Sequence, residues 1–187
     1  MEGPHILLRA LGTWVVAGGC ALSAFSEPLR FVEQRVEIPE RGTVTGYLVS
    51  INTNHFSFLP PPLWRTSHKP GGSAVAIISP DLATSIAIEF IARKPDEPPP
   101  KVATLFKERF AGAVSGDGFE FHTGLGASLA HDFHRKAAGG VRLTSRVVYV
   151  FTPASVIEFA LTAPATKFEE HTIFFANVVS SFRAAGQ

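Results

Sequence analysis

Apolar residues at every second position are the feature of this sequence that most constrains its fold. Between residues 84 and 92, Ile86, Ile88 and Phe90 alternate with polar or smaller residues. This period places apolar side chains on one face of an extended strand. Similar runs of β-branched and aromatic residues predict strands at residues 30–38, 44–51, 73–79, 84–92, 119–123, 127–136, 141–151 and 155–162. Most of the chain is therefore expected to form a sheet.

Two segments change from this period to a helical one. In residues 101–113, which follow the prolines at 98–100, apolar residues recur at spacings of three and four. In residues 166–182, Thr166 and Glu169 match the T-x-x-E capping box that begins many helices. The side chains predicted to face the sheet there are Phe168, Phe175, Val178 and Phe182, with His171 among them. The sequence therefore predicts an α+β domain with its C-terminal helix packed on the sheet.

Aromatic side chains, and not disulfides, are expected to hold the core together. The 187 residues include 16 Phe but a single cysteine, Cys20. About 160 residues follow position 26, which is the length of one domain with a sizeable core. Each buried Phe removes a large apolar area from water. Trp64, after the prolines at 60–62, is expected to anchor its loop against the core; the alternative is an exposed stacking residue. His171 is expected to be a hydrogen-bonded core histidine.

The first 26 residues are typical of a secretory signal. Arg9 precedes an apolar run at residues 10–25, and the composition turns polar at Ser26. The run is shorter than the roughly 20 residues that span a bilayer comfortably, and no second long apolar segment follows it. A basic residue, an apolar core and small residues before a polar boundary are the layout of an export signal. We therefore expect a signal helix at 1–26, removed after Ser26, and one exported domain at 27–187.

Cys20 offers an alternative interpretation of the same segment. Residues 16–20 read VAGGC, which resembles a permissive lipobox, and no charge lies between Arg9 and Cys20. In that case the signal would be residues 1–19, and a lipid on Cys20 would anchor the protein to a membrane. Ala17 stands where lipoboxes usually carry a larger aliphatic residue, so removal after Ser26 is the preferred interpretation.

Three segments carry a resemblance to a known family. They are FSFLPPPLWR at 56–65, AIISPDLATSIAIEF at 76–90 and FFANVVSSFR at 174–183. Together with the order of the elements, they resemble the PsbP/Mog/DcrB superfamily. The resemblance implies an α/β/α sandwich of the PsbP type, in which helices flank a central antiparallel sheet. Residues 30–51 are longer than the family's usual lead-in and do not map onto it.

The densest cluster of polar chemistry lies at residues 131–135, which read HDFHR. In a strand, Asp132 and His134 would share one face, while His131 and Phe133 would share the other. Asp132 and His134 could be two ligands of a divalent metal, with His122 of a neighbouring strand as the third. The alternative is a solvated polar strand face, which is the more frequent origin of a two-residue match.

Charge and motifs narrow the possible functions. The formal net charge is +1, with no cluster of Lys and Arg, so no nucleic-acid partner is expected. No motif of nucleophilic catalysis occurs, and no cofactor is expected. Members of the resembled family are mostly non-enzymatic: accessory subunits of photosystem II, adaptors of a small GTPase, or envelope proteins. The sequence and the resemblance thus predict an exported, non-enzymatic accessory or binding module that recognises a protein partner or an envelope component. The alternatives are a metal-binding protein or metal-dependent enzyme using residues 131–134, and a lipid-anchored structural protein of the envelope.

Overall fold

A computed structural model of the chain describes residues 28–40, 42–93, 98, 100–153 and 155–185. The signal segment expected at 1–26 and Cys20 both lie outside the described residues. None of the helices in the described part of the chain is long and apolar enough to cross a membrane.

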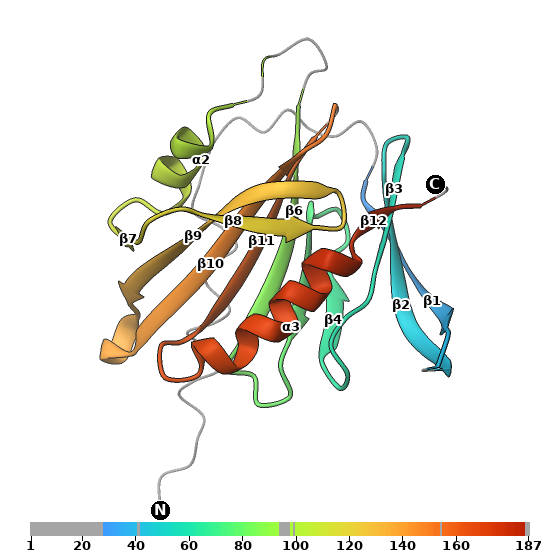
Figure 1. The fold of residues 1–187 in the computed structure, drawn as a ribbon, viewed down its shortest axis with the longest axis horizontal. Helices are drawn as coiled ribbons and strands as arrows, with labels where there is room; N and C mark the ends of the chain where they lie inside the picture. The colour runs from blue at the N-terminus through green and yellow to red at the C-terminus, as the bar shows by residue number, and fades with distance from the viewer. Residues whose placement is uncertain (1–27, 41, 94–97, 99, 154, 186–187) are drawn as a thin grey trace, which may run out of the picture.

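A large antiparallel sheet forms the centre of the molecule (Figure 1). Its strands run in the order β4-β5-β6-β11-β10-β9-β7, and β8 also pairs with β9. The strands are β4 (Arg65–His68), β5 (Ala74–Ile78), β6 (Ser85–Ala92), β7 (Val114–Ser115), β8 (Phe119–Thr123), β9 (Gly126–Lys136), β10 (Arg142–Phe151) and β11 (Ser155–Pro164). A short 3-10 turn, η1 (Ala138–Gly140), joins β9 to β10. The alternation predicted for β6 is confirmed, since Ile86, Ile88 and Phe90 are all buried in one core.

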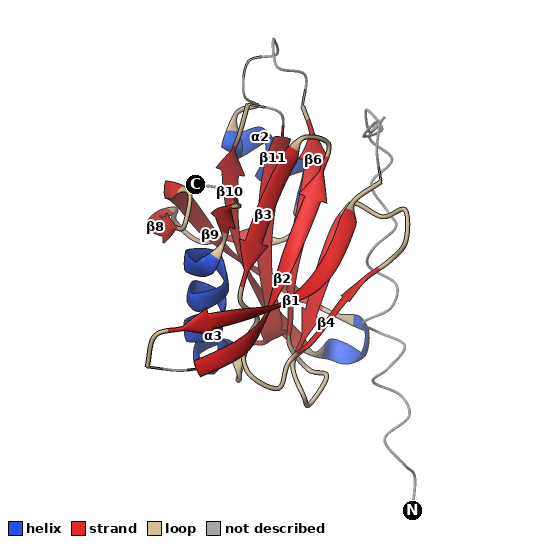
Figure 2. Ribbon diagram, turned by 90° about the vertical axis from the view of Figure 1, so that its right-hand side faces the viewer, coloured by secondary structure: helices blue, strands red, loops and turns tan. Residues whose placement is uncertain are grey.

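A second, smaller antiparallel sheet contains the segment that did not map onto the resembled family. Its order is β1-β2-β3-β12, with β1 (Arg30–Ile38), β2 (Gly42–Ile51), β3 (Asn54–Phe58) and β12 (Arg183–Ala184). The β1–β2 hairpin runs across the direction of strands β6 and β11 (Figure 2). Val49, Phe56 and Phe58 of this small sheet belong to the same buried core as the large sheet. One central sheet is therefore an incomplete description of the fold.

Helix α3 (Phe168–Ser181) packs on the large sheet, as the sequence predicts. Phe175 and Phe182 are fully buried. The predicted capping box is wrong, because the helix begins one residue later than the box requires. The N–H of Lys167 donates to the carbonyl of Pro164, which places Thr166 inside a turn and makes Lys167 the N-cap. Phe182 lies just after the helix in an extended conformation that leads into β12.

Helix α2 (Val102–Arg109) contacts the opposite face of the large sheet. Phe106 is buried there against Phe133 and Tyr149, in a second cluster of apolar side chains. The helix is shorter than the predicted 101–113. Phe110 already has the non-helical backbone of a C-cap, and Gly112 takes a left-handed φ of 80° that turns the chain toward β7.

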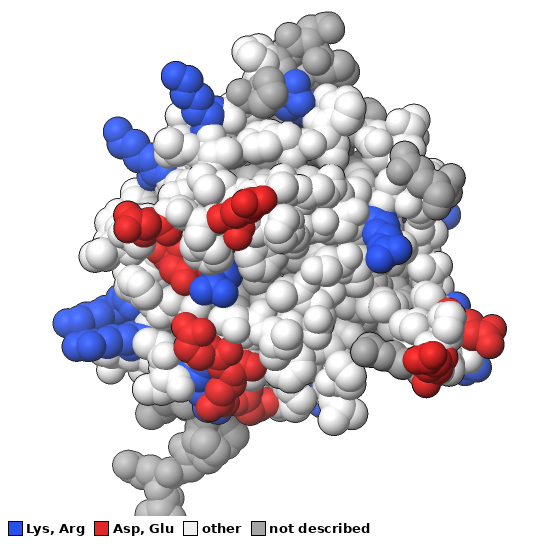
Figure 3. Space-filling model, viewed as in Figure 1, with Lys and Arg blue, Asp and Glu red and all other residues white. Residues whose placement is uncertain are grey.

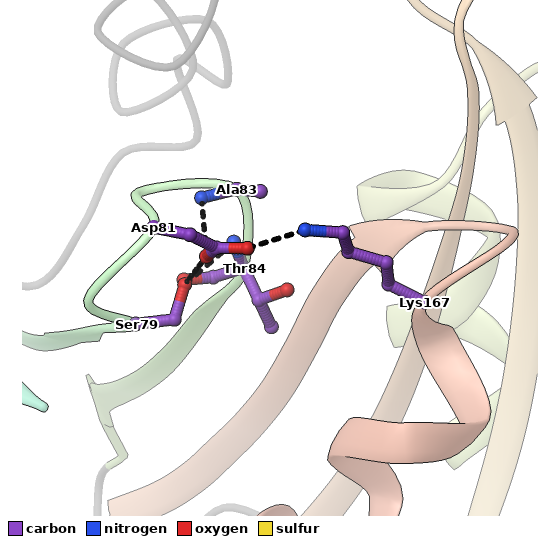
Figure 4. A network of polar contacts seen from close by, with 5 residues as sticks. All are labelled: Ser79, Asp81, Ala83, Thr84 and Lys167. Atoms are coloured by element: carbon purple, nitrogen blue, oxygen red, sulfur yellow. Dashed lines mark hydrogen bonds and ion pairs between the residues drawn. The ribbon is translucent and has the colours of Figure 1, made fainter.

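The turn between β5 and β6 holds the beginning of α3 in place (Figure 4). Asp81 accepts hydrogen bonds from the hydroxyl of Ser79 at 2.6 Å and from the N–H of Ala83 at 3.1 Å. It also forms an ion pair with Lys167, the N-cap of α3. These hydrogen bonds, first of all the one from Lys167, hold the pKa of Asp81 well below its ordinary value of 3.8. The turn and the helix are therefore joined most firmly when Asp81 is ionised.

Removing this charge is expected to change stability in a pH-dependent way. A carboxyl whose pKa is lowered by folding stabilises the native state above its unfolded pKa, and this stabilisation is lost as the pH falls. Asp81→Asn should therefore lower the urea midpoint near neutral pH, and the difference from the wild type should shrink as the pH falls below 3.8. Asp117→Asn, at an exposed position outside this network, is the matched control. A difference that is the same at neutral and acidic pH would contradict this assignment.

Candidate functional site

A row of polar side chains lies beneath α2, across three strands of the large sheet. Tyr149 on β10 is directly opposite Glu158 on β11, and Glu158 is directly opposite Glu89 on β6. The Tyr149 hydroxyl donates to Oε2 of Glu158 at 2.7 Å. Arg109, at the end of α2, reaches over this row: its Nε lies 3.3 Å from Oε1 of Glu158, and its guanidinium also pairs with Glu89. The row ties the last turn of α2 to the sheet.

Burial controls the electrostatics of this row. Glu158 has an exposed fraction of only 2%. Burial raises the pKa of Glu158, while the charge of Arg109 and the hydrogen bond from Tyr149 oppose that rise. Burial, with the nearby Glu158 charge, also raises the pKa of the Tyr149 phenol. Burial tends to lower the pKa of Arg109, but the charges of Glu158 and Glu89 outweigh it and raise that pKa. Each ionisable group in the row has a partner inside it, which is the arrangement of a structural anchor.

An open pocket of about 430 Å³ lies beside this row, between α2 and β9. Aromatic rings form most of its floor. Phe106 and His131 lie 4.3 Å apart between ring centroids, and Phe110 stacks on Phe133 at the same distance. The Nδ1 atom of His131 is buried and has no hydrogen-bond partner within the described part of the chain. The lining residues are Val102, Ala103, Phe106, Lys107, Phe110, Ala111, Gly112, Ala113, Ser115, Leu129, His131 and Phe133. We call this feature the α2 pocket.

The other face of β9 carries the predicted metal candidates Asp132 and His134. Asp132 accepts two hydrogen bonds of 2.8 Å from Arg146 of β10, in a bidentate ion pair. The Arg146 guanidinium also lies 4.8 Å from the ring centroid of Phe119 and 5.2 Å from that of Phe168. The Nδ1 atom of His134 lies 3.1 Å from the hydroxyl of Thr144. The predicted division of faces is confirmed, because His131 and Phe133 contact Phe106 of α2 on the other side.

The structure does not bring His122 to Asp132 and His134. His122 is directly opposite Ala127 in the β8–β9 pair, so it shares a face with His131 and not with its proposed co-ligands. Its side chain is 82% exposed and lies 4.0 Å from Glu120. Among the described residues there is no group of three or more His, Cys, Asp or Glu that could hold a metal ion. His122 is therefore wrong as the proposed third ligand, because it lies on the opposite face of the sheet from Asp132 and His134.

Trp64 anchors its loop, as expected. Its ring is partly buried against the main core and lies edge-on to His171 of α3 at 5.4 Å between centroids. A second contact, at 5.7 Å, joins Trp64 to Phe174. His171 is half-buried in this aromatic contact, but its buried Nδ1 has no hydrogen-bond partner among the described residues. The expected hydrogen-bonded core histidine is therefore corrected to an aromatic partner of Trp64.

Sequence reasoning missed the polar row beneath α2. Its signal is nevertheless visible, since Glu158 is the one charged residue in the mostly apolar run SVIEFAL. A carboxylate in the middle of a buried strand needs a partner, which the sequence supplies as an Arg on the predicted helix. Only the strand register shows that Tyr149 and Glu89 lie beside it.

Comparison with known proteins supports the fold. No family model and no curated protein sequence matches the chain. LpqN of Mycobacterium tuberculosis, described as involved in cell envelope biogenesis, aligns with a TM-score of 0.57 at 14% identity, over 82% of this chain and 91% of LpqN. A cyanobacterial PsbP, CyanoP of Synechocystis, aligns with a TM-score of 0.48 at 12% identity, over 79% of this chain and 96% of CyanoP. The chain therefore shares the fold of LpqN over most of both proteins.

A further similar structure comes from Bacteroides thetaiotaomicron. It aligns with a TM-score of 0.46 at 17% identity, over 71% of this chain and 46% of that protein. At these identities the similarities concern the fold alone, and no functional residue is carried over from any of these proteins.

Replacing Arg109 is expected to destabilise the protein, because the buried carboxylate of Glu158 then has no cation beside it. In Arg109→Met the carboxyl loses its cation, so its pKa rises further, and stability falls as the pH rises above the ordinary value of 4.5. We expect a loss of about 2 kcal/mol in the free energy of unfolding near neutral pH. The loss should be smaller below pH 4.5, as urea denaturation would measure. Lys107→Met, at an exposed position on the same helix, is the control. An equal loss of stability at both pH values would contradict the role given to Arg109.

Proposed function

We propose that this protein is an exported, non-enzymatic binding module of the cell envelope. In this proposal, the α2 pocket accepts an apolar group of a partner protein or of an envelope component. The observation that carries it is the aromatic floor of that pocket, in which Phe106, Phe110, Phe133 and His131 lie ring against ring.

The size and lining of the α2 pocket support this choice. Its volume of about 430 Å³ lies in the range of sites that accept small ligands or large side chains. Leu129 at its rim is 42% exposed, although it is a large apolar residue. Contact with an apolar group would remove Leu129 and the neighbouring ring surfaces from water, which is favourable. The polar row beside the pocket fixes α2, so one wall of the pocket is held in place.

The hydrogen bonds and ion pairs of Glu158 and Asp132 support a role without catalysis. Glu158 is held by Tyr149 and Arg109, and Asp132 is held by Arg146 on both carboxylate oxygens. A general base must lie within hydrogen-bond reach of a proton of the substrate, and Glu158 has an exposed fraction of only 2%. Carboxylates whose oxygens are already bonded within the fold suit structural roles better.

Export is supported by the layout of residues 1–26 and by the nature of one neighbour. LpqN, which shares the fold, is described as involved in cell envelope biogenesis. In this proposal residues 1–26 form a signal helix removed after Ser26, with acylation of Cys20 as the alternative. The mature part is then an α/β/α sandwich of the PsbP type, in which α3 and α2 are the outer layers.

A pocket-filling substitution tests the binding function. Ala103 lines the α2 pocket and is exposed, so Ala103→Trp should place an indole in the pocket without disturbing the core. We expect the wild type to bind the apolar fluorophore 1-aminoanthracene, and the variant to lose that binding. Thr104→Trp, at the next exposed position of α2 outside the pocket, should bind the fluorophore like the wild type. Binding that is absent from the wild type, or unchanged in Ala103→Trp, would refute the proposed site.

A further inference from the structure

The outer edge of the small sheet is formed by a long strand with no neighbour among the described residues. Strand β1 pairs with β2 on one side only and is terminal in the order β1-β2-β3-β12. All nine of its residues pair with β2, so its other edge presents a continuous row of backbone groups. Acidic and basic side chains lie side by side at the right-hand end of the molecule in Figure 3, where Figure 1 shows the β1–β2 hairpin.

The side chains of β1 divide into two faces of different character. One face carries Phe31, Glu33, Arg35 and Glu37, and the other carries Val32, Gln34, Val36 and Ile38. Glu33 and Arg35 are both exposed, and no ion pair among the described residues involves either of them. On the second face, Val32 is 51% exposed despite its apolar side chain. The strand thus presents unpaired charges of both signs and an uncovered valine along a free edge.

We propose that β1 pairs antiparallel with β1 of a second copy of this chain, on a two-fold axis that passes through Gln34. In that register Glu33 of each copy lies opposite Arg35 of the other, which gives two cross-strand ion pairs. Val32 of each copy lies opposite Val36 of the other, which covers the exposed valine. All nine residues of the strand take part, and the two small sheets become one continuous sheet.

The charges select this register over its neighbours. A two-fold axis perpendicular to the sheet keeps each residue on its own face only when the register moves in steps of two residues. One such step in one direction places Glu33 opposite Glu33 of the other copy. One step in the other direction places Arg35 opposite Arg35. Both neighbouring registers set like charges against each other, which destabilises a strand pair.

Charged residues on an edge strand usually prevent such pairing, because a partner strand rarely offers the complementary pattern. Here the sequence Glu33-Gln34-Arg35 is its own complement about a two-fold axis. The same charges that disfavour pairing with an unrelated strand therefore favour pairing with a second copy. This interface lies on the small sheet and does not involve the α2 pocket, so it does not depend on the proposed function.

Charge reversal in two separate variants tests this interface. Glu33→Arg gives each copy two arginines at these positions, and Arg35→Glu gives each copy two glutamates. In either variant the pairing would set like charges opposite each other at both contacts. We expect the wild type to sediment as a dimer, and each variant to dissociate with a Kd raised about tenfold or more. An equimolar mixture of the two variants should form a heterodimer as tight as the wild type, because each copy then supplies the charge that the other lacks.

A third variant separates this register from other effects of charge. Glu37 lies on the same face of β1, but in the proposed register it is opposite Phe31 and not a charged residue. Glu37→Arg makes the same change of charge as Glu33→Arg and should leave the dimer intact. A monomeric wild type, an undiminished dimer in Glu33→Arg, or a mixture of the two reversals that stays monomeric would each overturn the proposal. Because both reversed variants must be folded to pair in the mixture, its heterodimer cannot arise from misfolding.

Discussion

The packing of the Phe182 ring against both sheets is the interaction on which the rest of this structure depends. The ring lies 5.1 Å from Phe56 and 6.3 Å from Phe58 of the small sheet, measured between ring centroids. It also lies 5.0 Å from Phe159 and 6.3 Å from Phe90 of the large sheet. Phe182 itself follows the last residue of α3 and is fully buried. One side chain thus joins both sheets and the C-terminal helix in a single aromatic cluster.

The end of α3 also positions β9, which carries the α2 pocket on one face. The turn between β8 and β9 packs on the end of α3, where the N–H of Gly124 donates to the carbonyl of Val179 at 3.0 Å. A Cβ atom at Gly124 would lie only 2.1 Å from the carbonyl oxygen of Phe182. Only glycine allows the turn to come this close. The end of α3 therefore fixes the β8–β9 hairpin, and with it the floor of the pocket.

Much of this fold could be predicted from the sequence, because the strand period is a local property. The strands around Ile86 and Phe90, the helix containing Phe175 and the anchoring role of Trp64 all follow from residues close together in the chain. The second sheet could not be predicted in this way. Its strands β1, β2 and β3 follow one another, but the sheet is completed by Arg183 and Ala184, which return from the other end of the chain to pair with β3. The capping box failed for a similar reason, since Lys167 is held by Asp81 from a distant turn.

The candidate site was less predictable than the fold, because it depends on pairing between strands. The faces of Asp132 and His134 were predicted correctly from alternation within one strand. The place of His122 was not, because it depends on the register between two strands, which a single sequence does not specify. Glu158 and Glu89 lie far apart in the chain and meet only because β11 pairs with β6.

Hydrogen exchange of a Phe182→Leu variant tests the central claim most directly. This substitution keeps an apolar side chain but removes the ring that joins the two sheets. If Phe182 unites them, the most protected amides of β3, β6 and β11 should lose the same free energy of opening, about 1–2 kcal/mol. Ile173→Ala, on the exposed side of α3, should leave this protection unchanged. A loss confined to β3, with β6 and β11 as protected as in the wild type, would contradict the account.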